Sequence, residues 1–266
     1  MTVLQGILLG LLQGLTEFLP VSSSGHLALA EHFLGIENPG VTFEVFVHFG
    51  TAMAVVLFFR GRIASILVAL ARRAVRLQHD VAEVRLAMHL LVATIPAAAA
   101  GYFLAPRIEA AFESPVLVSI LLMVTGAVLW FSGKLFPGTK SRGTLIDALA
   151  IGVAQAFAIL PGISRSGSTV TAGLAVGLER KAAAEFAFLL SVPVIIGAAV
   201  ASLGDALEAG ASSGPALALG TLAAFLSALP AIAMLLRVVV AGKLSNFAYY
   251  CWAVGAVSLA FILTGS

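Results

Sequence analysis

Long apolar runs dominate the sequence, separated by short polar connections. Six of these runs are long enough, or nearly so, to cross about 30 Å of hydrocarbon as helices. Runs of this kind favour membrane helices over the short alternating strands of a membrane barrel. The pattern predicts spans over residues 42–59, 86–105, 116–133, 184–204, 215–236 and 247–264.

The composition supports an integral membrane protein. Of 266 residues, 60% are hydrophobic and 11% are charged, whereas about 25% are charged in an average soluble protein. So few charges exclude a soluble enzyme, a disordered chain and a nucleic-acid binder. A net charge of +2 is too small to indicate a polyanionic partner. The single cysteine, Cys251, excludes an intrachain disulfide.

The distribution of charge predicts the topology. Lys and Arg gather in the connections 60–85, 134–143 and 237–246, and the connections 106–115 and 205–214 carry one basic residue between them. The positive-inside rule places the first three in the cytoplasm and the other two outside, and all six spans then alternate. The first basic residue is Arg60, so we expect the N-terminus to be mature structure and not a signal peptide.

Two segments remain, 1–41 and 144–183, and the alternation requires each to return to its own side. Each holds two short apolar runs around a break rich in Pro, Gly and Ser. We interpret them as re-entrant helix–loop–helix hairpins, whose irregular backbone is tolerated at membrane depth only where protein or water satisfies it. The alternative is an ordinary pair of short spans.

The two hairpins resemble each other, which indicates an internal repeat. Pro20 and Pro161 are 141 positions apart, as are Glu44 and Glu185. The single membrane domain, 1–266, would then consist of a first repeat, 1–133, and an inverted second repeat, 144–266, with the site where the hairpins meet. Glycines at four-residue spacing favour close helix packing in both hairpins: Gly6, Gly10 and Gly14, and Gly173 and Gly177.

Polar residues concentrate in the two breaks, and polar residues inside a membrane are functional candidates. In the first, Gln13 and Glu17 share a helix face, Pro20 ends the helix, and a serine run follows. In the second, Arg165 is surrounded by hydroxyls and calls for an anionic partner such as phosphate. The other candidates are Ser22, Ser23, Ser24, His26, Gly162, Ser164, Ser166 and Thr169.

Together these groups suit phosphoryl transfer, because they provide anion binding, a nucleophile and proton-handling groups. A purely structural interpretation, with serine helix caps and a Glu17–Arg165 ion pair, is the alternative. A transporter is a second alternative, because inverted repeats with broken helices are a transporter architecture.

Two strings carry a resemblance to a known family. QGLTEFLPVSSSGH at 13–26 and LPGISRSGST at 160–169 are similar to the signature motifs of the undecaprenyl-diphosphate phosphatases, the bacitracin-resistance (BacA/UppP) family, and the similarity extends over essentially the whole chain. The family's first motif begins with Glu or Gln, and this chain has Gln13, which weakens any mechanism that needs two carboxylates there.

The resemblance implies an all-α polytopic enzyme of the bacterial inner membrane, with its site facing the periplasm. It would hydrolyse undecaprenyl diphosphate to undecaprenyl phosphate and phosphate, recycling the lipid carrier for peptidoglycan and conferring bacitracin resistance. The competing hypothesis is a lipid-phosphate transporter or flippase. The partners expected are the lipid substrate and bilayer lipids, with a homodimer as a further option and no nucleic acid.

The motif positions also imply roles. Arg165 and the second loop would hold the diphosphate, and Glu17 and His26 would handle protons. Ser23 is the candidate nucleophile, with His26 or a water as competing assignments. Glu17 with Gln13 would help to hold Mg²⁺ or Ca²⁺ over the phosphates. Supporting substrate contacts are expected from Gln13, Ser22, Ser24, Gly162, Ser164, Ser166 and Thr169.

Other polar residues give weaker signals. Glu44 and Glu185 begin spans at paired repeat positions, where they would line the cavity or bond to the opposing loop. His48 is interpreted as a neutral packed residue. Four aromatic residues near span ends are expected in the interfacial belts: Trp130, Tyr249, Tyr250 and Trp252.

Overall fold

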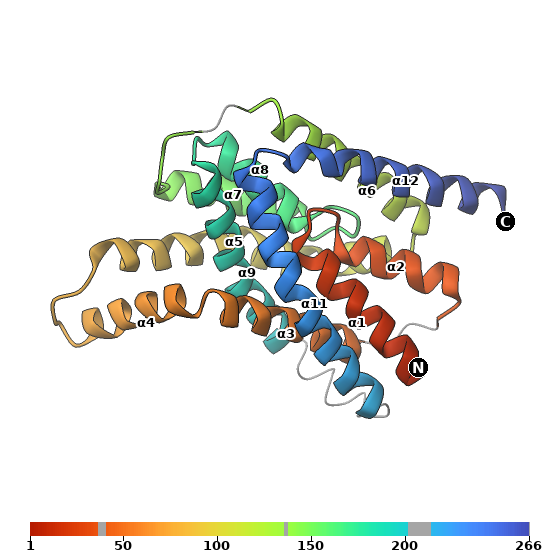
Figure 1. The fold of residues 1–266 in the computed structure, drawn as a ribbon, viewed down its shortest axis with the longest axis horizontal. Helices are drawn as coiled ribbons and strands as arrows, with labels where there is room; N and C mark the ends of the chain where they lie inside the picture. Colours follow the sequence, from red (N-terminus) through yellow and green to blue (C-terminus); the bar gives the residue numbers. More distant parts are fainter. Residues whose placement is uncertain (37–40, 136–137, 202–213, 266) are drawn as a thin grey trace.

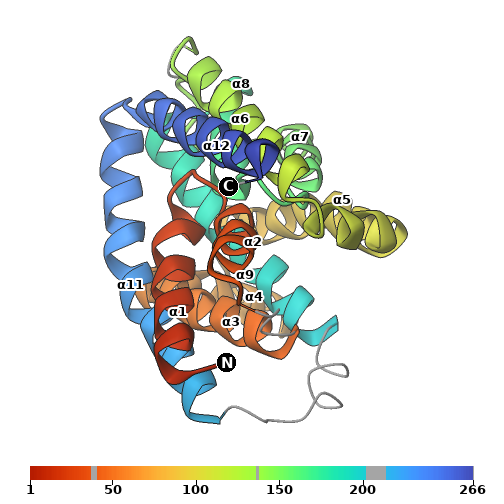
Figure 2. The ribbon, with the colours of Figure 1, turned by 90° about the vertical axis from the view of Figure 1, so that its right-hand side faces the viewer.

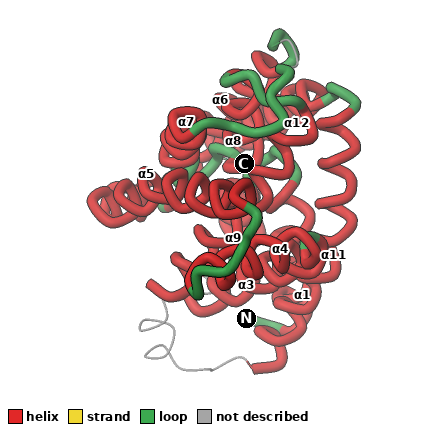
Figure 3. The backbone as a smooth tube through the Cα atoms, turned by 90° about the vertical axis from the view of Figure 1, so that its left-hand side faces the viewer, coloured by secondary structure: helices red, strands yellow, loops and turns green. Residues whose placement is uncertain are grey.

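The protein is an all-α membrane protein. The computed structural model describes residues 1–36, 41–135, 138–201 and 214–265, and in this part of the chain short loops join the helices (Figures 1 and 3). The helices are α1 (Val3–Phe18), α2 (Ser23–Leu34), α3 (Val41–Phe58), α4 (Arg60–Ala74), α5 (Val81–Phe112), α6 (Pro115–Ser132), α7 (Leu145–Phe157), α8 (Arg165–Ala175), α9 (Arg180–Ala201), α11 (Gly214–Val240), the 3₁₀ turn η1 (Leu244–Asn246) and α12 (Phe247–Thr264).

Five of the predicted spans correspond to helices long and apolar enough to cross a bilayer. They are α5, α6, α9, α11 and η1 with α12. The predicted span 42–59 is α3, which bends by 81° into α4. The connection 60–85 therefore contains a helix that the charge pattern alone did not suggest. The end of the span 184–204, and the connection 205–214 except Gly214, lie outside the described residues.

The two candidate hairpins are pairs of short helices. Helices α1, α2, α7 and α8 have 16, 12, 13 and 11 residues, and at 1.5 Å per residue the longest spans about 24 Å. None can cross about 30 Å of hydrocarbon alone. Both pairs begin alike, because Thr2 forms a capping box with Gln5 and Thr144 forms one with Asp147. That each pair returns to its own side of the bilayer stays a prediction.

Close packing holds the first hairpin against the second half of the chain. Helix α1 lies along α11, as Figures 1 and 2 show. A Cβ on Gly6 would lie 2.6 Å from the carbonyl oxygen of Ala216, and Gly10 and Gly14 meet α11 backbone just as closely. The predicted small-residue face is confirmed here. Gly177 was wrongly assigned to such a face, because α8 ends at Ala175 and Gly177 takes a φ of 90° in the following turn.

Other pairs of helices also pack along each other in the bundle. Helix α7 packs along α5, and α6 packs along α12. An aromatic contact chain joins the bend after α3 to the first hairpin, with ring centroids 5.5 Å apart for Phe59 and Phe188 and 5.6 Å apart for Phe188 and Phe18. Phe18 is buried and follows Glu17 directly, so this core supports the polar centre described next.

Candidate active site

The breaks of the two hairpins interlock. A Cβ on Gly25 would lie 2.9 Å from the Cα of Gly162, so only glycine fits at this crossing. The backbone N–H of Gly162 donates to Ser22 Oγ at 3.1 Å, and Ser166 Oγ donates to the carbonyl oxygen of Leu19 at 3.2 Å. These contacts join residues about 140 positions apart into one polar unit.

Helix α6 fixes the second loop through a residue that the motif analysis missed. Thr125 Oγ1 donates to the carbonyl oxygen of Gly162 at 2.7 Å and accepts from the N–H of Ser164 at 2.9 Å. Gly162 has a φ of 99°, in the region open mainly to glycine. A lone threonine in an apolar span carries no sequence signal for this role.

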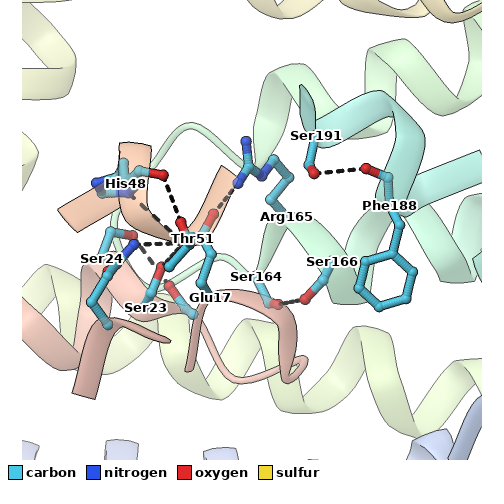
Figure 4. Close-up of polar contacts among 12 residues, drawn as sticks. Glu17, Ser23, Ser24, His48, Thr51, Ser164, Arg165, Ser166, Phe188 and Ser191 are labelled. Atoms are coloured by element: carbon cyan, nitrogen blue, oxygen red, sulfur yellow. Dashed lines mark hydrogen bonds and ion pairs between the residues drawn. The ribbon is translucent and has the colours of Figure 1, made fainter. Parts of the chain in front are cut away.

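Four elements converge on the carboxylate of Glu17 (Figure 4). Its side chain is 3% exposed and forms an ion pair with Arg165 at the start of α8. Ser23 Oγ, at the start of α2, donates to Oε2 at 2.5 Å, and Gln13 Nε2 donates to the same oxygen at 3.0 Å. Nε2 of His48 on α3 lies 3.8 Å from Oε2. The Glu17–Arg165 ion pair that the structural interpretation proposed is therefore present, and the Ser23 hydroxyl also contacts the carboxylate directly.

His48 is the functional candidate that sequence reasoning undervalued. The prediction that it is a packed, neutral residue is wrong about its packing, because its side chain is 32% exposed and lines the cavity beside Glu17. Nδ1 donates to the backbone carbonyl of Glu44 at 2.8 Å, which directs Nε2 toward Glu17. One histidine in an apolar helix is indistinguishable in sequence from a core residue.

A cavity of about 720 Å³ opens beside this centre and is lined by both polar and apolar residues. The part of the lining around Glu17, called the polar end below, holds Ser22, Ser23, Ser24, His48, Ser164 and Arg165. The walls include Leu27, Val45, Ala97, Ile159, Ile163, Val194 and Ile195. Such a cavity suits a ligand with an anionic head and an apolar tail.

Further carboxyl groups line the same cavity: Glu31, Glu44, Glu109 and Glu113. Glu185, the repeat partner of Glu44, is absent from this lining. It lies 2.8 Å from Nε of Arg62, whose Nη1 contacts Glu83 at 2.6 Å. The paired glutamates thus differ, since one lines the cavity and the other joins α9 to α4 and α5.

Not all predicted site residues face the large cavity. Ser166 and Thr169 line a separate void of about 10 Å³ with Glu17 and Arg165, about the size that holds one water. Gln13 is fully buried behind Glu17. His26 lines neither space, because Nδ1 contacts the carbonyl oxygen of Ser22 at 2.8 Å and Nε2 contacts the Tyr250 hydroxyl at 2.9 Å.

The protein groups alone do not fit a resident divalent cation. Among the described residues there is no group of three or more His, Cys, Asp or Glu side chains suited to a metal. The Glu17 carboxylate faces the Arg165 guanidinium, and the amide nitrogen of Gln13 points at that carboxylate. A metal cation beside the Glu17 carboxylate is disfavoured, because the guanidinium is positively charged and the amide nitrogen is a hydrogen-bond donor.

Comparison with known proteins identifies the family. The sequence profile of the family described as "Bacitracin resistance protein BacA" matches residues 6–257. The chain belongs to the BacA family. BacA-family relatives include a Desulforapulum autotrophicum protein named "Undecaprenyl-diphosphatase", 44% identical over 97% of this chain and 98% of its own length.

Two further BacA relatives carry the same name. The Syntrophotalea carbinolica protein is 45% identical over 98% of this chain and 99% of its own length. The Methanobrevibacter smithii protein is 40% identical over 97% of this chain and 96% of its own length. The BacA match includes both interlocked loops and helices α2 to α11 in full, so the whole polar unit lies within the family region.

Proposed function

We propose that the chain hydrolyses undecaprenyl diphosphate to undecaprenyl phosphate and inorganic phosphate, and so recycles the lipid carrier of the bacterial envelope. The names of its relatives support this activity. The observation that carries it is the buried Glu17, in contact with both Ser23 and Arg165, at the polar end of a cavity with apolar walls. As the family resemblance implies, this cavity would belong to an inner-membrane protein and open toward the periplasm.

The diphosphate would bind where two helices begin. Ser23 and Arg165 are the first residues of α2 and α8, and both line the cavity. Free N–H groups and the helix dipole attract anions at such positions. Arg165 would exchange part of its contact with Glu17 for the terminal phosphate, whose oxygens match the planar guanidinium. Ser24 and Ser164 would add hydroxyl contacts.

Ser23 is the proposed nucleophile and Glu17 the proposed base. As Ser23 Oγ attacks the terminal phosphorus, its proton passes to Glu17 Oε2, 2.5 Å away. The bond from phosphorus to the bridging oxygen breaks, and the lipid monophosphate leaves with the bond electrons. Water then attacks the phosphoserine, releasing phosphate and restoring the serine hydroxyl. In the competing route, Ser23 orients a water that attacks directly.

His48 would carry protons between Glu17 and the cavity water. The Glu17 side chain is only 3% exposed, whereas His48, whose Nε2 lies 3.8 Å from Oε2 of Glu17, lines the cavity and is 32% exposed. We expect His48→Gln to lower kcat about 10²-fold, because an amide cannot transfer protons. Phosphate release measured across pH checks this, with the exposed His32→Gln as control. Equal rates in the two variants would contradict the role.

The direct test is phosphate release from undecaprenyl diphosphate by purified protein in detergent. We expect one phosphate and one lipid monophosphate per diphosphate consumed. Because phosphates themselves attract Mg²⁺ or Ca²⁺, any divalent cation would arrive with the substrate. A chelator should then slow release and added Mg²⁺ restore it, while calorimetry detects no Mg²⁺ binding to the protein alone. Absence of phosphate release under all these conditions would refute the function.

A further inference from the structure

The loop that presents Ser23 contains a strained residue. Ser22 has φ 68° and ψ 96°, a region that residues other than glycine rarely occupy. Such conformations persist only where the surroundings enforce them. Two donors approach Ser22 Oγ, the N–H of Gly162 at 3.1 Å and that of Gly25 at 3.3 Å. The carbonyl of Ser22 is held separately, by His26.

His26 bonds that carbonyl twice. Its backbone N–H donates to the oxygen of Ser22 at 3.1 Å, and its ring Nδ1 does so at 2.8 Å. A carbonyl oxygen only accepts, so Nδ1 must carry the proton. In the neutral ring Nε2 then has a lone pair, and it lies 2.9 Å from the hydroxyl of Tyr250, which can donate to it. This chain of bonds defines one tautomer.

Tyr250 and the adjacent Cys251 bring α12 against the first loop. The rings of Tyr250 and His26 stack with centroids 5.6 Å apart and an interplanar angle of 5°. Cys251 is fully buried, with Sγ 3.8 Å from the carbonyl oxygen of Pro20. Tyr250 lines neither the cavity nor the small void, so an effect of its hydroxyl on the reaction would pass through His26, the partner of that hydroxyl.

We infer that Tyr250 is a positioning residue for this active site. Its hydroxyl fixes the ring of His26, His26 fixes the carbonyl of Ser22, and the strained Ser22 aims Ser23 Oγ at the carboxylate of Glu17. The inference rests on the proposed function. It also accounts for His26, which acts as an anchor of the loop and does not contact the substrate.

The chain provides a matched control in Tyr249, the neighbouring tyrosine on α12. Tyr249 is 65% exposed and meets Trp252 edge-on. We expect Tyr250→Phe to lower kcat for phosphate release about 5- to 10-fold, the equivalent of one lost hydrogen bond. KM should change less than about twofold, since the cavity lining is intact. Tyr249→Phe should match the unchanged protein in both constants.

Two further measurements separate positioning from general stability. If the two residues act as a unit, Tyr250→Phe should add little to the loss caused by His26→Gln. Nitrogen NMR of ¹⁵N-histidine protein, with His26→Gln for assignment, should show one neutral ring protonated at Nδ1. Tyr250→Phe should shift that signal, and Tyr249→Phe should leave it in place, with both variants fully folded at the assay temperature.

Several results would overturn the inference. They are a kcat for Tyr250→Phe equal to that of Tyr249→Phe, a loss expressed only in KM, additive losses in the double variant, or a His26 ring protonated at Nε2. Each of these leaves phosphate release by the unchanged protein intact, so the proposed function would survive. Failure of the unchanged protein to release phosphate would refute that function instead, and with it a role of Tyr250 in the reaction.

Discussion

Arg165→Ala is expected to abolish phosphate release, with kcat/KM reduced about 10³- to 10⁵-fold, as for other arginines that stabilise phosphoryl-transfer transition states. Among the described Lys and Arg side chains, the Arg165 guanidinium is the one that contacts Glu17 at the polar end of the cavity. Without it, a terminal phosphate would face the buried carboxylate with no compensating charge, which Coulomb repulsion disfavours strongly in a low dielectric.

The lysine variant distinguishes charge from geometry. Arg165→Lys keeps the charge but loses the planar fork that binds two phosphate oxygens, so most of the activity should still be lost. Both variants are compared with Arg142→Ala, which removes an exposed arginine outside the site. Removing Arg165 leaves Glu17 buried without its ion-pair partner, at a cost of about 3–5 kcal/mol of stability, so each variant is assayed only below its unfolding transition. A near-normal rate for Arg165→Ala in folded protein would contradict the binding role.

The sequence alone predicted the elements that carry strong local signals. Long apolar runs defined the spans, because only helices satisfy their own backbone in hydrocarbon. The breaks at Pro20 and Pro161 located the loops, and the hydroxyls around them marked the polar unit. The isolated charges Glu17 and Arg165 marked the site, because neither has a partner of opposite charge nearby in sequence.

The sequence could not predict the roles of residues that act through tertiary contacts. Thr125, His48 and Tyr250 lie in predominantly apolar helices, where a polar side chain usually bonds to its own helix or packs against its neighbours. Their roles depend on helices α6, α3 and α12 reaching loops that are distant in sequence. The interfacial position of Tyr250 and Trp252 stays a prediction, and the sequence did not indicate that the Tyr250 hydroxyl contacts His26 or that Trp252 Nε1 donates to the carbonyl of Met123 at 3.0 Å.

The inverted repeat stays a prediction, but the packing has the reciprocity that such a repeat requires. The first hairpin packs through α1 on α11, and the second packs through α7 on α5. The loops also match in detail. Ser22 and Ser164 each accept from the N–H three residues later, and their hydroxyls lie 3.3 Å from Ser24 Oγ and 3.2 Å from Ser166 Oγ. Ser23 follows Ser22 in the first loop, and Arg165 follows Ser164 in the second. Two loops of similar structure would therefore supply the nucleophile and the cation.

Glu17→Gln tests the base in that arrangement and should lower kcat about 10³-fold or more. The amide has the shape of the carboxylate but cannot take the proton of Ser23 at neutral pH, and loss of general base catalysis costs about 10²- to 10⁴-fold. It also leaves Arg165 without its anionic partner, so binding of the diphosphate should weaken little or tighten. The measurement is kcat and KM for phosphate release, with the exposed Glu179→Gln as the matched control.

The same variant discriminates between the two chemical routes. If Ser23 is the nucleophile, protein quenched during turnover should carry phosphate on Ser23, and both Glu17→Gln and Ser23→Ala should remove that label. If Ser23 only orients a water, no label forms in any variant, although Ser23→Ala still slows release because the 2.5 Å contact with Glu17 is lost. Phosphate trapped on His26 would contradict both routes, since His26 lies outside the cavity with both ring nitrogens occupied. A normal rate for Glu17→Gln would remove the base from the mechanism and leave Arg165 and the helix N-termini as the only supported contributors.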